Sequence, residues 1–138
     1  MSALLEIKEY IGGNPRSDLD LAEIVENGLS TDSLGVLREK GLTFTEVAEL
    51  VASPRTLQHR KAKGIHHLTH DEADRVVRLA RILSLAEQVF GNLERGLGWL
   101  RTPDERLNNR TALSMLQTES GGRLVESMLW QVADGIYS

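Results

Sequence analysis

Apolar residues recur at helical spacing through most of the chain and predict a series of short helices. Residues 20–27 and 31–40 each carry an apolar stripe and are followed by Gly28 and Gly41, and glycine commonly ends a helix. No segment alternates convincingly between apolar and polar residues with a period of two, the pattern of a half-buried strand. We therefore expect an all-α fold.

Residues 41–64 have the pattern of two short helices around a tight turn. Thr43 and Glu46 have the spacing of a capping box, and Ser53 followed by Pro54 is a second helix start. The second helix offers a core only one large apolar residue, Leu57. A helix with so little apolar surface must be held by its neighbour, and its free face suits the DNA major groove. The pattern predicts a helix-turn-helix.

A much longer helix is predicted over residues 71–90. Thr69 and Glu72 form a second capping box, and Gly91 follows the last apolar residue. Apolar residues cover more than one face of this helix, so one layer of packing cannot bury them all. It either links two halves of the molecule or meets a second copy of itself, and we expect a homodimer. The chain then divides into an arm (1–18), a helix-turn-helix and dimerisation region (19–81) and a C-terminal helical domain (82–138).

Smaller helical segments are expected in the C-terminal domain. A short helix follows Asn92 and stops near Pro103, a loop covers residues 104–110, and a helix covers residues 111–118. The pair Gly121-Gly122 is expected to interrupt the helical pattern. A last helix then runs to Gly135 and leaves a short tail. Its inward residues are expected to be Leu124, Val125, Met128, Leu129, Val132 and Ala133.

Charge is distributed unevenly along the chain. The net charge is −4, but residues 51–81 carry seven basic residues against three acidic ones. Residues 1–50 carry ten acidic residues against four basic ones, and residues 82–138 carry seven against five. Attraction to phosphate acts over roughly 10 Å at moderate salt, so a local basic patch can bind DNA despite an acidic remainder.

The second helix of the helix-turn-helix supplies the candidate DNA contacts. Arg55, Thr56 and His59 are expected near the base edges, and the amide of Gln58 can pair with adenine. The cations toward its end suit phosphates, which set register and not sequence. A solvated basic face on an ordinary helical hairpin is the alternative. The full candidate set is Arg55, Thr56, Gln58, His59, Arg60, Lys61 and Lys63.

Composition argues against several classes of protein. Without cysteine the chain has no thiol nucleophile or thiolate ligand, and its four histidines have no carboxylate partner at ligand spacing, so we expect no metal and no other cofactor. No spacing indicates a nucleophile elbow or a catalytic carboxylate pair, and we do not expect an enzyme. No apolar run approaches the roughly 18 residues of a membrane span. With no signal peptide visible, a cytoplasmic protein is expected.

A set of ordered motifs over roughly six-sevenths of the chain carries a family resemblance. The motifs are Arg55-Thr-Leu-Gln-His-Arg60, Leu68 to Arg81 with Asp74-Arg75 and Arg78-Leu-Ala-Arg81, Ala86-Glu-Gln-Val-Phe-Gly91, Gly98-Trp-Leu-Arg-Thr-Pro103, Leu116-Gln-Thr-Glu119 and Val125 to Gly135-Ile-Tyr. From about Asp18 onward the chain resembles Xre-type antitoxins of the Xre/MbcA/ParS group, from RES–Xre toxin–antitoxin pairs. Relatives often carry a glycine pair where this chain has Asn108-Asn109, and asparagine tolerates the same left-handed backbone.

The resemblance implies a function for each half of the chain. The helix-turn-helix half would bind and repress the operon's own promoter, and family members associate through this half. The C-terminal half would bind a RES-type toxin, which is similar to ADP-ribosyltransferases and degrades NAD, and the antitoxin dimer would assemble with toxin into a higher-order complex. In the family the last helix and tail block the toxin's active site, and they correspond here to residues 128–138. The expected toxin contacts are Met128, Trp130, Gln131, Gly135, Ile136, Tyr137 and Ser138.

Other functions stay open on the sequence alone. The chain could be a stand-alone transcriptional regulator whose C-terminal half serves only for dimerisation or effector binding. It could also be an interaction protein whose helix-turn-helix no longer binds DNA. The ends of chains are often frayed and without function, which is the alternative for the last three residues.

Overall fold

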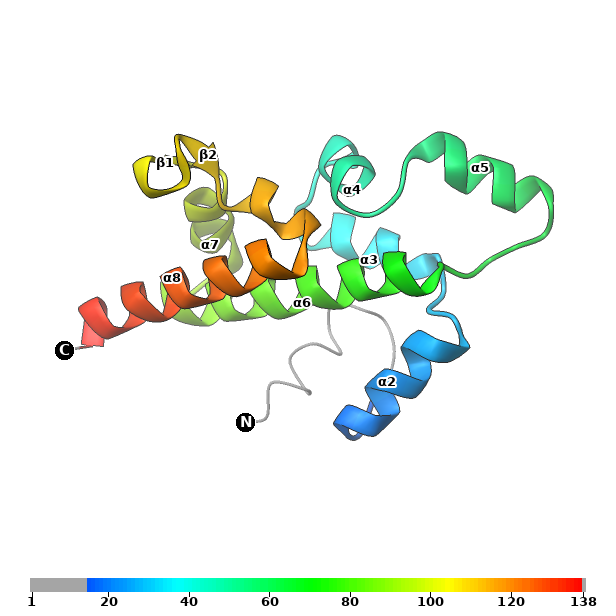
Figure 1. The fold of residues 1–138 in the computed structure, drawn as a ribbon, viewed down its shortest axis with the longest axis horizontal. Helices are drawn as coiled ribbons and strands as arrows, with labels where there is room; N and C mark the ends of the chain where they lie inside the picture. Colours follow the sequence, from blue (N-terminus) through cyan, green and yellow to red (C-terminus); the bar gives the residue numbers. More distant parts are fainter. Residues whose placement is uncertain (1–14, 138) are drawn as a thin grey trace.

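The protein is mostly helical, and its elements are arranged along two long helices (Figure 1). The computed structural model describes residues 15–137, with side chains as far as Gly135, so most of the expected arm lies outside the described residues. The elements of the first half are α2 (Asp18–Asn27), α3 (Asp32–Glu39), α4 (Phe44–Leu50), α5 (Pro54–Ala62) and α6 (His70–Phe90). Those of the second half are α7 (Leu93–Leu100), β1 (Pro103–Asp104), η1 (Glu105–Leu107), β2 (Arg110–Thr111), η2 (Leu113–Gln117) and α8 (Glu119–Tyr137). Within the described range, no helix has the length and apolar character needed to cross a bilayer.

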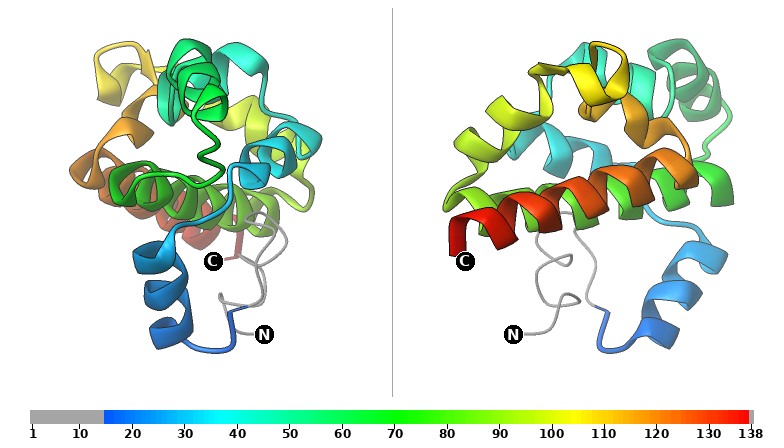
Figure 2. Two further views of the ribbon diagram at one scale, coloured as in Figure 1. Left: turned by 90° about the vertical axis from the view of Figure 1, so that its right-hand side faces the viewer. Right: turned by 60° about the vertical axis from the view of Figure 1, so that its left-hand side comes forward.

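The long helix α6 is the centre of the molecule and joins its two halves. It packs against α2 and α3 of the first half and against α7, η2 and α8 of the second (Figures 1 and 2). Val76, Leu79 and Ile82 along its length are at most 1% exposed. The apolar faces that suggested a second copy of this helix are therefore covered by the chain itself, and the expectation that α6 links two halves is confirmed.

The helix starts read from the sequence are confirmed. Thr43 accepts a hydrogen bond from the backbone N–H of Glu46, and the Glu46 carboxylate accepts one from Thr43 N, which completes the capping box of α4. The same pair of bonds joins Thr69 and Glu72 at α6. Ser53 caps α5, with Pro54 at its first position. These ends form because short-range polar groups satisfy the free N–H groups of a first turn.

The glycine pair Gly121-Gly122 does not break a helix, contrary to the expectation from sequence. Helix α8 runs from Glu119 through both glycines and through Gly135 to Tyr137. A Cβ atom at Gly121 would lie 1.9 Å from the carbonyl oxygen of Met115, and one at Gly122 would lie 2.9 Å from Cδ of Arg78. The pair is needed because α8 passes very close to η2 and to α6. Gly135 likewise lies within the helix and does not end it.

Residues 101–118 form a compact turn instead of a helix-loop-helix. β1 and β2 pair antiparallel, with η1 between them, and η2 is a 3-10 helix where an α-helix was expected. Asn108 and Asn109 have φ values of 56° and 64°, in the left-handed region. The expectation that asparagine can take these conformations here is confirmed. The left-handed backbone at the two asparagines keeps the loop closed.

Candidate functional site

Helices α4 and α5 form a helix-turn-helix around residues 51–53. Val51 and Ala52 in the turn are buried, whereas α5 itself has no buried residue. Of the residues in α5, Leu57 packs partly against the core. Figure 1 shows α5 projecting from one end of the molecule, away from α7 and the end of α8. The position and exposure of α5 suit a recognition helix.

Most of the candidate DNA contacts are exposed on α5 and its C-cap. The exposed members of the set are Arg55, Thr56, Gln58, His59, Lys61 and Lys63. α5 contains no acidic residue to neutralise them. Thr56 Oγ1 accepts a hydrogen bond from Ser53 Oγ at 2.8 Å, and its own proton stays available as a donor. These residues present a polar, positively charged surface of the kind that contacts bases and phosphates.

Arg60 differs from the other candidates because its guanidinium is already occupied. It makes two hydrogen bonds to the carboxylate of Glu72, one of them 2.7 Å long, and its side chain is only 18% exposed. Burial raises the pKa of Glu72, but the bonds from Arg60 and from the backbone of Thr69 outweigh it and hold the pKa below the ordinary value. The structure thus places the guanidinium of Arg60, expected at a phosphate, in an internal ion pair with Glu72. Glu72 had no signal in the sequence beyond its capping box.

The histidines near α5 serve the packing of two loops. His66 O accepts hydrogen bonds from Thr31, and His67 pairs with Ser30 in an isolated antiparallel bridge. The Nε2 atom of His70 lies 2.8 Å from the carbonyl oxygen of Glu26. Among residues 15–135, no three histidine or acidic side chains are grouped so that they could hold a metal ion.

The candidate toxin contacts on α8 divide into exposed and buried positions. Trp130 is 53% exposed, and Gln131 and Gly135 are also exposed. Met128 is 4% exposed and belongs to the core, as its place in the inward stripe predicted, so its side chain is not presented on the surface of α8. Ile136 and Tyr137 continue α8, so they are not a tail, while their side chains and all of Ser138 lie outside the described residues.

An apolar groove lies beside Trp130, between α6 and α8. Its volume is about 320 Å³, and it is lined by Leu85, Gln88, Val89, Trp130, Ala133 and Asp134. Leu124, expected to face inward, is instead 44% exposed on the same helix. Its spacing from Met128 matches an inward stripe, so the sequence carried no signal for this exposure. Leu124 and Trp130 lie six residues apart and therefore about 120° from each other around the helix, so each is a separate exposed apolar side chain on α8.

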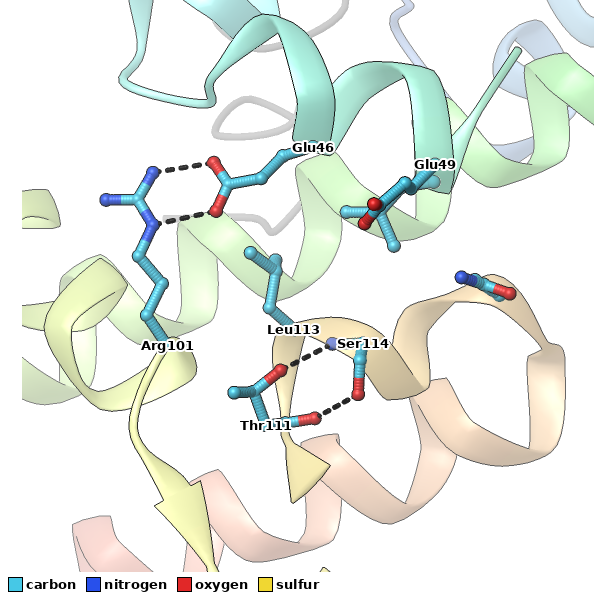
Figure 3. A pocket seen from close by; sticks show the side chains of 8 residues that line it. Glu46, Glu49, Arg101, Thr111, Leu113 and Ser114 are labelled. Atoms are coloured by element: carbon cyan, nitrogen blue, oxygen red, sulfur yellow. Dashed lines mark hydrogen bonds and ion pairs between the residues drawn. The ribbon is translucent and has the colours of Figure 1, made fainter. Parts of the chain in front are cut away.

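A polar pocket of about 230 Å³ separates α4 from η2 (Figure 3). Glu46 and Glu49 line it from α4, and Arg101, at the end of α7, spans to Glu46 through two hydrogen bonds. On the η2 side, Ser114 Oγ donates to the carbonyl oxygen of Thr111 at 2.7 Å. The hydroxyl is thus engaged locally and not presented as a nucleophile. The pocket marks the contact between the two halves of the molecule.

Comparisons with known proteins match both halves. Residues 20–81 match the antitoxin Xre-like helix-turn-helix domain, and residues 85–135 match the antitoxin Xre/MbcA/ParS C-terminal toxin-binding domain. The chain is 35% identical over 135 residues to an antitoxin Xre of Pseudomonas putida, a match that covers 98% of this chain and 81% of the relative. It is 23% identical over 120 residues to an antitoxin Xre of Yersinia enterocolitica, covering 86% of this chain and 81% of the relative.

Proposed function

Because this chain belongs to the Xre family of antitoxins, we propose that it neutralises a RES-type, NAD-degrading toxin and represses its own operon. In this proposal the antitoxin covers the toxin's active site. Such inhibition requires no chemistry from the antitoxin, which acts as a regulator and not as an enzyme. The observation that carries the proposal is the exposed Trp130 near the end of α8, inside the toxin-binding domain.

Trp130 and Leu124 are the proposed anchors on the toxin. Exposed tryptophan is enriched among residues whose truncation most weakens a protein interface. Gln131, Gly135, Ile136, Tyr137 and Ser138 extend the proposed contact to the end of the chain. Because α8 stays helical through Tyr137, the proposed plug is the last turn of a preformed helix, which loses less conformational entropy on docking than a loose tail would.

The proposed repression acts through α5. Arg55, Gln58 and His59 would lie in the major groove, with Thr56 beside them, and Lys61 and Lys63 would contact phosphates. The projection of α5 from the body and the absence of acids on it support this placement. A bound antitoxin would then exclude polymerase from the promoter of its own operon.

We further propose a cytoplasmic homodimer that joins toxin in a larger assembly. Two copies related by a two-fold axis would place their α5 helices in half-sites about 34–36 Å apart, one helical turn of DNA. The proposed dimer is based on the resemblance to family members, which associate through their N-terminal halves. It is not based on α6, because the apolar faces of that helix are already covered.

Growth rescue by a truncated antitoxin tests the proposal. A chain lacking residues 135–138 should fold, bind promoter DNA and protect poorly against the toxin encoded beside it. The matched control is the full-length chain with the charges of Arg55 and Lys61 reversed, which should protect fully and lose promoter binding. Full protection by the truncated chain would rule out blocking of the active site by the end of α8.

A stand-alone transcriptional regulator is the second candidate. The pocket between the halves favours it, since a small effector bound against Glu49 and Arg101 would touch both halves at once. Co-purification distinguishes the two functions. An untagged RES-domain protein encoded by the neighbouring gene should be captured by the tagged antitoxin, whereas a stand-alone regulator would be recovered alone.

A further inference from the structure

Helix α5 is attached to the rest of the protein by few apolar contacts. None of its residues is buried, and Leu57 is its apolar residue that packs partly against the core. Apolar burial normally fixes the pose of a helix, because its free energy scales with the area removed from water. A helix with so little buried area needs other contacts to hold one orientation.

Two polar contacts from the first turns of α6 supply this attachment. At the end of α5, Arg60 forms its two bonds to Glu72, and at the turn before α5, Arg75 donates from a terminal nitrogen to the carbonyl oxygen of Val51 at 3.1 Å. Glu72 and Arg75 lie three residues apart and therefore on neighbouring positions of one helix face. One face of α6 thus holds the segment that contains α5 at both ends.

Glu72 is the central residue of this arrangement. It is 6% exposed, and its Oε1 atom accepts hydrogen bonds from both Arg60 and the backbone N–H of Thr69, the latter at 2.9 Å. The planar fork of an arginine on a carboxylate fixes direction as well as distance. The carboxylate therefore sets the start of α6 and the end of α5 relative to each other.

We propose that Glu72, Arg60 and Arg75 are positioning residues for DNA binding, which hold α5 in the pose that enters the groove without touching DNA themselves. This inference rests on the proposed DNA-binding function of α5. It assigns Arg60 a role opposite to that of the exposed cations beside it. Lys61 acts by its charge on DNA, and Arg60 acts by its geometry on α5.

Substitution of Glu72 separates positioning from simple electrostatics because the two predict opposite signs. Glu72→Gln keeps the capping box, in which glutamine also serves, and removes a negative charge next to the basic helix. If charge alone mattered, the variant would bind DNA more tightly. If Glu72 positions α5, the variant binds DNA more weakly. The loss is about tenfold when only a tenth of the variant molecules hold α5 in its binding pose.

The experiment measures fluorescence anisotropy of a labelled duplex covering the region upstream of the protein's own start codon, at several salt concentrations. Glu72→Gln and Arg60→Lys should each weaken binding and leave the slope of log affinity against log salt unchanged. Lys61→Met should instead make that slope shallower by about 0.9, the value for one lost phosphate contact. Arg106→Met, which removes an exposed arginine paired with Asp104 in the C-terminal half, is the matched control and should bind as the wild type does.

Each outcome decides the proposal. Equal or tighter binding by Glu72→Gln, or wild-type affinity of Arg60→Lys, in which lysine could still contact a phosphate but could not form the two-bonded fork to Glu72, would overturn it while leaving DNA binding in place. Wild-type protein that does not bind the duplex would overturn the proposed repression as well. Hydrogen exchange of each variant without DNA checks its fold. Amide protection in Glu72→Gln should fall in α5 and persist in α8. If Glu72→Gln loses protection throughout the chain, Arg60→Lys becomes the deciding variant, because it leaves the capping box intact.

Discussion

Arg101 and Glu46 form a two-bonded ion pair that joins the C-terminal half to the helix-turn-helix. Nε and a terminal nitrogen of Arg101 donate to the carboxylate at 2.9 and 2.7 Å (Figure 3). The same terminal nitrogen donates to the carbonyl oxygen of Gly41 at 2.8 Å. The hydrogen bonds from Arg101 are the main cause that holds the pKa of Glu46 below its ordinary value. One arginine thus fastens the end of α7 to the start of α4.

Removal of this pair should weaken the protein modestly. Arg101→Met is expected to lower the free energy of unfolding by about 1 kcal/mol at neutral pH, because the arginine side chain is 38% exposed and water screens the pair. Urea unfolding followed by circular dichroism measures this. An unchanged midpoint would mean that this ion pair contributes nothing to the stability of the contact between the two halves.

The effect of Arg101→Met should depend on pH in one direction. The pKa of Glu46 is lower in the folded protein, so its pairing stabilises the fold above the ordinary glutamate pKa of about 4.3 and is lost as pH falls through the lower folded value. The difference in unfolding free energy between wild type and variant should therefore be constant near neutral pH and shrink below about pH 4. A difference that grows on acidification would contradict the pairing.

Two residues of α5 should affect DNA binding differently. Gln58→Ala is expected to reduce affinity for the promoter duplex by about 1–3 kcal/mol and to leave affinity for a duplex of random sequence nearly unchanged. Lys63→Ala should reduce affinity for both duplexes equally, because a phosphate contact carries no sequence information. Titration of both duplexes at one salt concentration provides the comparison. If Gln58→Ala loses the same affinity for both duplexes, Gln58 does not contact a base.

Trp130→Ala should weaken toxin binding without unfolding the antitoxin. A side chain that is 53% exposed contributes little to the core, whereas a central aromatic contact at an interface is worth about 2 kcal/mol or more. Calorimetric titration with purified toxin measures the change. Phe44→Ala is the matched control, because Phe44 is 56% exposed on α4, where its ring lies 5.2 Å from the guanidinium of Arg38. If both variants bind the toxin with equal affinity, the toxin does not contact Trp130.

The glycine at position 121 should not tolerate a methyl group. Gly121→Ala places a Cβ atom against the carbonyl oxygen of Met115 and is expected to lower the unfolding free energy by about 3 kcal/mol, at the upper end of overpacking losses. Gly98→Ala is the control, since a Cβ atom there meets no atom within 4 Å and alanine favours the helix. Thermal unfolding of the two variants should therefore shift in opposite directions.

The parts of the fold that depend on neighbouring residues were predictable from the sequence. The capping boxes of Thr43 and Thr69 and the Ser53-Pro54 start use side chains within three residues of the groups they satisfy, so their spacing alone identifies them. Gly91 ends α6 with φ at 89°, a conformation that glycine adopts readily. The helix-turn-helix and the central position of α6 followed from these local rules.

The features that depend on distant residues were not predictable. A glycine pair can end a helix or can allow a helix to pack closely against another segment, and the sequence of the pair is the same in both cases. At Gly121 the close approach of Met115 requires the second role. Arg60 looks like its basic neighbours until Glu72, twelve residues later, is placed beside it. Leu124 is exposed although the inward stripe included it, because the rotation of α8 depends on its contact with α6, whereas Met128 is buried as that stripe predicted.

The separation of α5 from the last turns of α8 has a consequence for how promoter and toxin share the antitoxin. The two segments lie at opposite ends of the molecule, with α6 between them (Figure 1). On the proposed assignment of these two surfaces, neither ligand has to leave for the other to dock on the same chain. Competition between them, where it occurs, must arise from strain passed along the helices or from crowding among copies on the operator.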